Sequence, residues 1–241
     1  MPERDASTPA LLIRHLGPTD YRATWEAMQR FTDSREATTA DELWLTEHPP
    51  VYTLGLAGRS GHLLRGNGIE VIKVDRGGQV TYHGPGQLVA YTLVDLRRAH
   101  LGIREMVRRL ESAVIAWLGA HAIAAWGKVE APGVYVGGGA TTAGVASGEA
   151  KIAALGLKVR RHCTYHGLSV NIAMDLAPFA DIDPCGYPGL AVTDLSRLGV
   201  QRTVAQAAEE IAPYLVEALS AAPPRPEGGV TMLESPVQPR P

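Results

Sequence analysis

Apolar residues recur three or four positions apart, the spacing of one face of a helix, in two segments of the chain. The two sets are Tyr21, Trp25, Met28 and Phe31, and then Ile103, Val107, Leu110, Val114 and Trp117. The pattern predicts a helix in each segment, the first capped by Thr19 or Asp20. Near the end of the chain, Thr203 and Gln206 form the pattern of a capping box, which predicts a third helix with a bend at Pro213.

Strand-like runs lie between these helices. Two short extended pieces are predicted within residues 42–55, divided at Pro49 and Pro50, because proline lacks the N–H that a strand donates to its neighbour. Five more strands are predicted at residues 71–74, 87–96, 133–136, 152–159 and 164–172. Strands therefore occur both singly between helices and in consecutive pairs. This order predicts an α+β or mixed α/β fold, with a mixed, partly antiparallel sheet packed with helices.

The chain reads as one domain with two flexible ends. Residues 1–9 and the Pro-rich residues 222–241 offer little to pack, whereas no long polar linker interrupts residues 10–221. The composition, 45% apolar and 20% charged over 241 residues, is that of a globular protein.

Charge and hydropathy exclude several kinds of partner. A formal net charge of -2 argues against bulk binding of nucleic acid or of an anionic membrane. The start of the chain lacks the pattern of a signal peptide, and no run approaches the ~18 apolar residues of a membrane span. Two cysteines do not make a secreted disulfide framework. We expect a cytoplasmic protein without nucleic-acid or membrane partners.

The common nucleotide and hydrolase motifs are absent. The sequence contains no P-loop, no dinucleotide-binding glycine pattern, no Gly-x-Ser-x-Gly elbow and no His-Glu-x-x-His. These absences argue against binding of ATP or NAD, and against serine-hydrolase chemistry.

Residues 76–87 are the densest candidate binding segment. Five glycine and proline residues there surround Arg76 and His83. Glycine lets the backbone approach a ligand closely, so that exposed amides become donors to a carbonyl or an oxyanion. An ordinary glycine-rich hairpin is the alternative. For His83, both an acid/base role and a structural hydrogen bond stay open.

Two further side chains have candidate chemistry. Lys151 stands between a Gly/Ala-rich loop and an apolar strand, where lost solvation would lower its pKa and suit it to acid/base work; a solvated strand-end lysine is the alternative. Cys185 lies in a Pro/Gly turn, whereas Cys163 begins a strand and is expected to be a buried small hydrophobe. A nucleophilic thiol is therefore expected at Cys185, although a structural thiol there stays open.

A zinc site built from His162, Cys163, His166 and Cys185 is disfavoured. Adjacent residues on a strand point to opposite faces, so His162 and Cys163 would not converge on one ion. Their spacing also matches no standard structural zinc pattern.

At these segments the sequence resembles the lipoyl(octanoyl) transferase family. The resemblance covers about residues 10 to 210 and rests on residues 47–55, 76–87, 131–136, 151–153, 165–168 and 184–186, together with Asn171. It implies a fold similar to the catalytic domain of biotin and lipoate protein ligases, but without ATP-dependent activation.

The resemblance also implies a reaction and a site. An octanoyl group would pass from octanoyl-acyl carrier protein to Cys185, with Lys151 as its partner, and then to a lysine ε-amine on a lipoyl domain. The acceptors would be the lipoyl domains of 2-oxoacid dehydrogenase complexes and the glycine cleavage H protein. No metal or other cofactor is expected. The implied substrate-binding residues are Arg76, Gly77, Gly78, Gln79, Val80, Thr81, Tyr82, His83, Ala154, Leu155, Gly156, Gly167, Leu168 and Ser169.

The sequence departs from the family pattern at two places, a lengthened loop at residues 137–148 and Leu56 in place of a common glutamine.

Because a carrier protein is acidic, a basic docking rim is expected, and a merely solvated surface is the alternative. The candidates for that rim are Arg104, Arg108, Arg109, Lys158, Arg160 and Arg161. Three other functions stay open: an ATP-dependent lipoate or biotin ligase, a cysteine hydrolase, and a non-catalytic module that binds acyl-protein.

Overall fold

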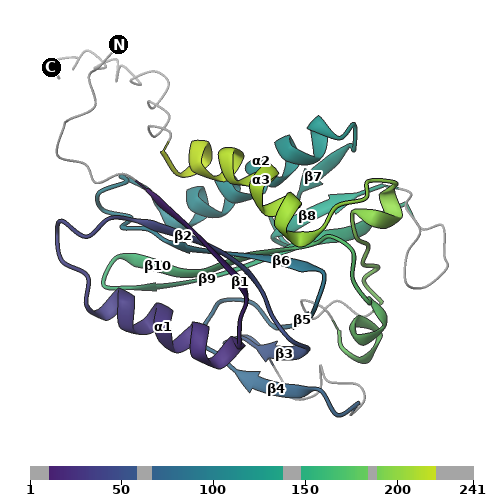
Figure 1. The fold of residues 1–241 in the computed structure, drawn as a ribbon, viewed down its shortest axis with the longest axis horizontal. Helices are drawn as coiled ribbons and strands as arrows, with labels where there is room; N and C mark the ends of the chain where they lie inside the picture. The colour runs from purple at the N-terminus through teal and green to yellow at the C-terminus, as the bar shows by residue number, and fades with distance from the viewer. Residues whose placement is uncertain (1–10, 59–66, 138–147, 184–188, 221–241) are drawn as a thin grey trace, which may run out of the picture.

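The computed structural model describes residues 11–58, 67–137, 148–183 and 189–220 (Figure 1). Its helices are α1 (Tyr21–Asp33), α2 (Ile103–Ala120) and α3 (Val204–Ser220). Its strands are β1 (Leu12–Pro18), β2 (Glu42–Glu47), β3 (Val51–Leu54), β4 (Glu70–Lys73), β5 (Val80–His83), β6 (Gln87–Leu93), β7 (Ala125–Gly127), β8 (Gly133–Val136), β9 (Ala150–Arg160) and β10 (Cys163–Asn171).

The strands form two sheets. The larger has the order β1-β2-β6-β10-β9-β8-β7 and is antiparallel except for the β1–β2 pair. The smaller has the order β4-β3-β5, with β3 parallel to β4 and antiparallel to β5. The predicted mixed, partly antiparallel sheet packed with helices is therefore confirmed.

The larger sheet is covered on both faces. Helices α2 and α3 pack on one face, and α1 with strands β3–β5 lies on the other (Figure 1). The main core fills the space between the sheet and α2 and α3, and includes Leu110, Trp117 and Ile211. On the opposite face, a second cluster forms around Tyr52, Tyr82 and Phe179. The region between the two sheets holds the candidate site.

The three predicted helices are present, two where apolar periodicity placed them and one after the predicted capping box. Asp20 caps α1 by accepting a hydrogen bond from the Ala23 N–H at 2.9 Å. The capping box at α3 is also formed, because Thr203 and Gln206 exchange side chain–backbone hydrogen bonds of 2.9 and 3.2 Å. No described helix is long and apolar enough to cross a membrane.

Three strands were missed by the sequence analysis. Strands β1 and β7 lie at the two edges of the larger sheet, and β1 is exposed along its length, so neither carries a strong apolar pattern. Strand β5 lies inside the glycine-rich segment 76–87. That segment is therefore neither one continuous loop nor a hairpin, because β5 pairs with β3 in the smaller sheet and β6 enters the larger one.

Candidate active site

A cavity lies between the two sheets. Twelve of the fourteen residues expected to bind substrate line it. These are Arg76, Gly78, Gln79, Val80, Thr81, His83, Ala154, Leu155, Gly156, Gly167, Leu168 and Ser169. The structure thus brings three separate sequence segments around one space. Their role as substrate contacts stays a prediction.

The other two residues of that set lie away from the cavity lining. The Tyr82 ring packs 5.5 Å from the rings of Tyr52 and Phe179, in the core behind β5. This follows from strand alternation, which sends Tyr82 and His83 to opposite faces of β5. The Gly77 N–H donates to the Leu157 carbonyl at 2.9 Å, so it ties the 76–79 loop to β9.

Four lining residues were not predicted: Tyr21, Val89, Tyr91 and His166. Tyr21 and Tyr91 belong to apolar patterns that indicate only a helix face and a strand. His166 does stand beside the predicted Gly167–Ser169 segment, and its polarity within a buried strand was the available signal.

Buried rings form the inner end of the cavity. His83 stacks on Tyr21 with ring centroids 5.7 Å apart. Its Nδ1 donates to the Gln87 amide oxygen at 2.7 Å, and its Nε2 lies 3.3 Å from the Thr53 hydroxyl. Burial, together with the charge of His48, lowers the pKa of His83 to about 3. With a neutral ring and both nitrogens engaged, the geometry favours a structural hydrogen-bonding role for His83.

Two more buried histidines are held by polar partners. His48 Nε2 lies 2.6 Å from the Tyr91 hydroxyl, and His166 Nε2 lies 3.0 Å from Asp75 Oδ1. Burial would raise the pKa of Asp75, but hydrogen bonds from His166, Tyr165 and Trp25 outweigh it and lower that pKa. The ring nitrogens of these buried histidines are thus engaged by neighbouring polar side chains.

Arg76 is also held firmly. Its guanidinium donates to the Thr53 carbonyl at 2.7 Å, to the Thr53 hydroxyl at 2.8 Å and to the Gly77 carbonyl at 2.9 Å. These bonds fix the start of the 76–79 loop against β3.

A second, smaller cavity adjoins the first, and Lys151 lines it. Thr81, Ala154 and Ser169 line both cavities and so form the boundary between them. The remaining lining residues of the smaller cavity are Gln87, Ile152, Ala153, Asn171, Phe179 and Val192.

Lys151 is buried rather than solvated, with 3% of its surface exposed. It is the second residue of β9, where a bulge shifts the pairing so that Val134 faces Ala153 but Tyr135 faces Lys151. Bulges re-aim side chains, and here the Lys151 amine donates to the Pro132 carbonyl at 3.0 Å and lies 5.1 Å from the centre of the Tyr135 ring. The alternative of a solvated strand-end lysine is excluded.

Cys185 lies outside the described residues, as does most of the lengthened loop at 137–148. The described chain on either side of residues 184–188 reaches the smaller cavity, because Phe179 and Val192 both line it. Backbone bonds then join the following segment to Lys151, whose N–H donates to the Ala191 carbonyl at 2.8 Å.

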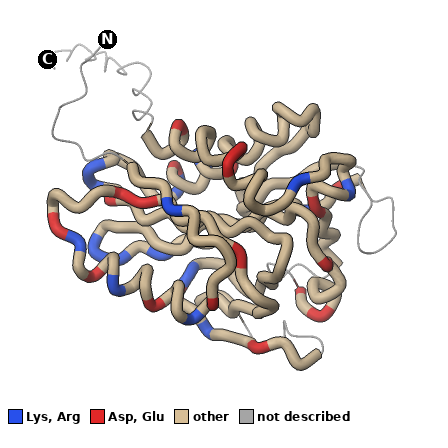
Figure 2. Tube along the Cα trace, viewed as in Figure 1, with Lys and Arg blue, Asp and Glu red and all other residues tan. Residues whose placement is uncertain are grey.

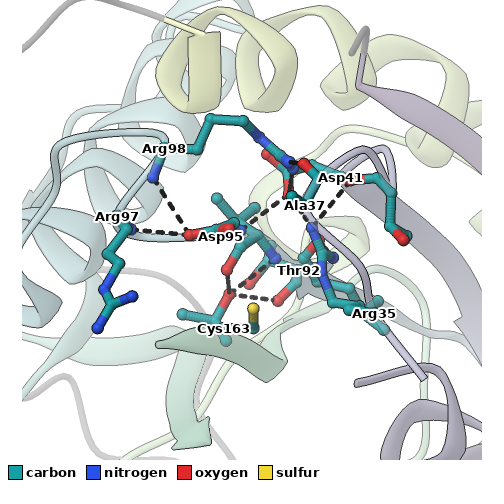
Figure 3. A network of polar contacts seen from close by, with 12 residues as sticks. Arg35, Ala37, Asp41, Thr92, Asp95, Arg97, Arg98 and Cys163 are labelled. Carbon is teal, nitrogen blue, oxygen red and sulfur yellow. Dashed lines mark hydrogen bonds and ion pairs between the residues drawn. The ribbon is translucent and has the colours of Figure 1, made fainter. Parts of the chain in front are cut away.

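Cys163 is a free, buried thiol at the start of β10 and lines neither cavity. Burial raises the pKa of its thiol. Figure 3 shows its sulfur beside a network of ion pairs and hydrogen bonds. Cys163 begins β10, whereas Ser169, which lines the cavities, lies near the end of that strand. The network includes Arg35, Asp41, Asp95 and Arg98.

The basic residues expected to form a rim are divided between two places. Arg104, Arg108 and Arg109 belong to α2, on the sheet face opposite β3–β5 (Figure 1). Lys158 and Arg160 belong to β9, next to the 76–79 loop that Leu157 contacts. Lys and Arg positions gather near α1 and the turn between β9 and β10 (Figure 2). Among the described residues, no three His, Cys, Asp or Glu side chains gather as metal ligands do.

Comparison with known sequences gives consistent matches. The family model for the lipoyl protein ligase A/B catalytic domain matches residues 20–216. An octanoyltransferase of Chromobacterium violaceum is 57% identical over 209 residues, which cover 87% of this chain and 96% of the relative. An octanoyltransferase of Laribacter hongkongensis is 58% identical over 203 residues, covering 84% of this chain and 93% of the relative.

Comparison with solved structures bears on the fold alone, because the identities are low. A T. acidophilum protein with bound lipoic acid superposes with a TM-score of 0.66 at 16% identity, covering 88% of this chain and 85% of that one. Lipoate-protein ligase A bound with ATP gives a TM-score of 0.57 at 16% identity, covering 88% and 84%. The expected similarity to the ligase catalytic fold is confirmed.

Proposed function

This chain belongs to the lipoyl protein ligase A/B catalytic domain family, within its octanoyltransferases, and from that premise we propose its reaction. It is an acyltransferase. It moves an octanoyl group from octanoyl-acyl carrier protein to the ε-amine of a lysine on a lipoyl domain, through a thioester on Cys185. The observation that carries this proposal is the meeting of the two cavities at Thr81, Ala154 and Ser169, with Lys151 in the smaller one.

The larger cavity is the site for the octanoyl chain. Ring nitrogens of His83 and His166 and the Tyr91 hydroxyl already have hydrogen-bond partners, so that these rings offer mainly apolar surface to a hydrocarbon. Burial of each methylene of the acyl chain favours binding by about 0.8 kcal/mol, so a chain that fills the cavity binds more tightly than a shorter one. A chain longer than the cavity would meet the buried rings at its inner end, and chain length is selected in this way.

The first half-reaction uses Lys151 as a charge partner. The Cys185 thiolate, favoured by the Lys151 ammonium, attacks the thioester carbonyl of the donor. The C–S bond to the carrier breaks, and the departing thiolate takes a proton from Lys151. The products are the octanoyl-enzyme thioester, the carrier thiol and a neutral lysine.

The second half-reaction uses Lys151 as a base. The acceptor amine attacks the acyl-enzyme carbonyl, and Lys151 takes the proton that this nitrogen loses. The C–S bond to Cys185 breaks as the amide forms, which regenerates the thiolate and the ammonium.

Donors to the carbonyl oxygen belong at the boundary between the cavities. Thr81 and Ser169, which carry hydroxyls, line both cavities, and a backbone amide of Leu155 or Gly156, residues that line the larger cavity, is a further candidate. The Gly77 N–H is unsuitable because it already donates to the Leu157 carbonyl.

Carrier-bound donor and lipoyl-domain acceptor are the partners of this reaction. Lipoyl domains of 2-oxoacid dehydrogenase complexes and the glycine cleavage H protein are the acceptors that we propose. An ATP-dependent ligase reaction is less supported, since the relatives at 50–58% identity that cover most of the chain are octanoyltransferases.

The test is to mix the protein with octanoyl-acyl carrier protein without ATP and to measure its intact mass. We expect one octanoyl adduct, mapped by peptide analysis to Cys185, that disappears on addition of a lipoyl domain as that domain gains the same mass. Cys185→Ala should abolish the adduct, and the matched variant Cys163→Ala should retain it, because Cys163 lines neither cavity.

Each other outcome rejects a part of the proposal. Transfer by Cys185→Ala would reject the nucleophile, and a strict need for ATP would indicate a ligase. Free octanoate in place of acylated lipoyl domain would indicate a hydrolase, and binding without any adduct would indicate a non-catalytic module.

A further inference from the structure

One peptide group links two buried, oppositely charged side chains beside the smaller cavity. The carbonyl of Pro132 accepts a hydrogen bond from the Lys151 amine at 3.0 Å. The N–H of the same peptide, which belongs to Gly133, donates to Glu111 Oε1 at 2.7 Å. A carboxylate and an amine thus bind the two ends of one peptide dipole.

The approach of Lys151 to this peptide is very close. A Cβ atom at Gly133 would lie 2.3 Å from Lys151 Cε and 2.9 Å from its Nζ. Gly133 also has φ +145, in the region that favours glycine. The Lys151 side chain therefore occupies the space that a side chain at position 133 would need.

Glu111 comes from a different part of the fold. It lies on α2, forty positions before Lys151 in the sequence, and 8% of its surface is exposed. Burial raises the pKa of Glu111, while the Gly133 N–H and the positive charge of Lys151 oppose that rise. The charge of Lys151 is thus felt at the Glu111 carboxyl group.

We propose that Glu111 is a positioning residue for Lys151: the Glu111 carboxylate holds the Pro132–Gly133 peptide, and this peptide holds the Lys151 amine in the smaller cavity. A carboxylate on the N–H end polarises the peptide and makes its carbonyl a stronger acceptor for the ammonium. The inference rests on the proposed function for the role of Lys151 in acyl transfer.

The first test is Glu111→Gln, which keeps a carbonyl oxygen for the Gly133 N–H but removes the charge. We expect kcat for octanoyl transfer to fall about tenfold, with KM for the carrier-bound donor unchanged, because a charge-assisted bond is replaced by a neutral one. The matched control is Glu105→Gln on the same helix, whose carboxylate binds Arg108 and Arg109 instead and which should keep wild-type kcat. Equal kcat values for Glu111→Gln and wild type would overturn the proposal.

A double-mutant cycle shows whether Glu111 acts through Lys151. Adding Glu111→Gln to Lys151→Met should produce no further loss in the rate of octanoyl-enzyme formation, since the group being positioned is already absent. Losses that multiply would show that Glu111 acts independently, and would reject the positioning role.

A spectroscopic test requires neither substrate nor a stable Glu111 variant. In protein labelled with ¹⁵N-glycine, we expect the Gly133 amide proton to resonate downfield and to move upfield in Lys151→Met, because the peptide loses its partner at the carbonyl. An unchanged Gly133 resonance would overturn the proposal even if Glu111→Gln does not fold. If wild type forms no octanoyl-enzyme but this resonance moves, the proposed function fails and the link between Glu111 and Lys151 stands.

Discussion

Lys151 is a buried lysine whose amine is directed by a strand bulge and by the Pro132 carbonyl. In the proposed reaction it has two duties, to favour the Cys185 thiolate and to move a proton. A substitution can separate these duties, because arginine keeps a positive charge but cannot act as a base with a pKa above about 12.

We predict different defects for two Lys151 variants. Lys151→Ala should raise the pKa of the Cys185 thiol and slow both half-reactions. Lys151→Arg should keep a near-normal pH profile of iodoacetamide labelling at Cys185 and yet transfer poorly to the lipoyl lysine. The measurements are that labelling profile and single-turnover transfer. Identical results for wild type and both variants would show that Lys151 takes no part in the reaction.

At the level of elements, the turn that leads into β8 determines the position of the Lys151 amine, because the Pro132 carbonyl in this turn accepts its hydrogen bond. Pro132 and Gly133 form the end of this turn, and Tyr135 also holds it, because the Tyr135 hydroxyl donates to the Ala131 carbonyl at 2.8 Å. The conformation of the turn therefore depends on Tyr135 of β8 and on Glu111 of α2.

We predict that Gly133→Ala displaces the Lys151 amine, because the new Cβ would lie 2.3 Å from Lys151 Cε. The Cβ cannot move away from the lysine, because it would also lie 2.8 Å from the Ala153 carbonyl oxygen. A displacement of about 1 Å should cost roughly a hundredfold in transfer rate. Gly148→Ala is the matched control, since its Cβ would meet nothing within 4 Å. Wild-type transfer by Gly133→Ala would show that the close approach is unimportant.

At the scale of the whole molecule, the buried histidines of the cavity make the free energy of unfolding depend on pH. A histidine with a lowered pKa in the folded state binds its proton more readily when unfolded. For His83 the window runs from about pH 6.5 down to about pH 3, and stability falls as the pH falls through it, by up to about 1.4 kcal/mol per pH unit.

We therefore predict that His83→Gln reduces the loss of melting temperature between about pH 7.5 and about pH 5 relative to wild type, because glutamine takes up no proton on unfolding. The exposed His15 offers the control variant His15→Gln, which should behave as wild type does. Thermal unfolding at a series of pH values measures both. An unaltered acid slope in His83→Gln would place the acid sensitivity elsewhere.

The positions of the basic residues on the molecule predict which of them contact the acidic carrier protein that brings the octanoyl group. Lys158 follows Leu157, whose carbonyl accepts from the Gly77 N–H, and it pairs across the sheet with Tyr165, next to His166 of the cavity lining. Arg108, by contrast, is 71% exposed on α2 and pairs with Glu105. A carrier protein that delivers its chain to the cavity would approach Lys158.

We predict that Lys158→Glu raises KM for the carrier-bound donor roughly tenfold at low salt and less at high salt. Arg108→Glu, the matched reversal on the opposite face, should leave KM unchanged. A small octanoyl thioester without the carrier should be used equally well by both variants. Equal KM values for the two reversals with the carrier-bound donor would reject docking at Lys158.

Much of the local structure follows from the sequence by itself. The period of apolar residues identified two helices and the Thr203–Gln206 capping box a third, Asp20 marked the start of the first helix, and proline divided β2 from β3. These features depend on neighbours within a few residues, so they can be read along the chain. The glycine-rich motif and the position of Lys151 also marked candidate site segments, because their residue types are unusual together.

Only the tertiary structure decided which side chains share a space. Strand β5, within the glycine-rich segment, pairs with β3 in the smaller sheet, so that Tyr82 lies in the core while Thr81 and His83 face the cavities. Tyr21, from α1, and Glu111, from α2, reached the site from distant helices whose patterns indicate only an apolar face. Periodicity records that a side chain is buried but not what it contacts, because contacts between elements depend on how those elements are packed in three dimensions.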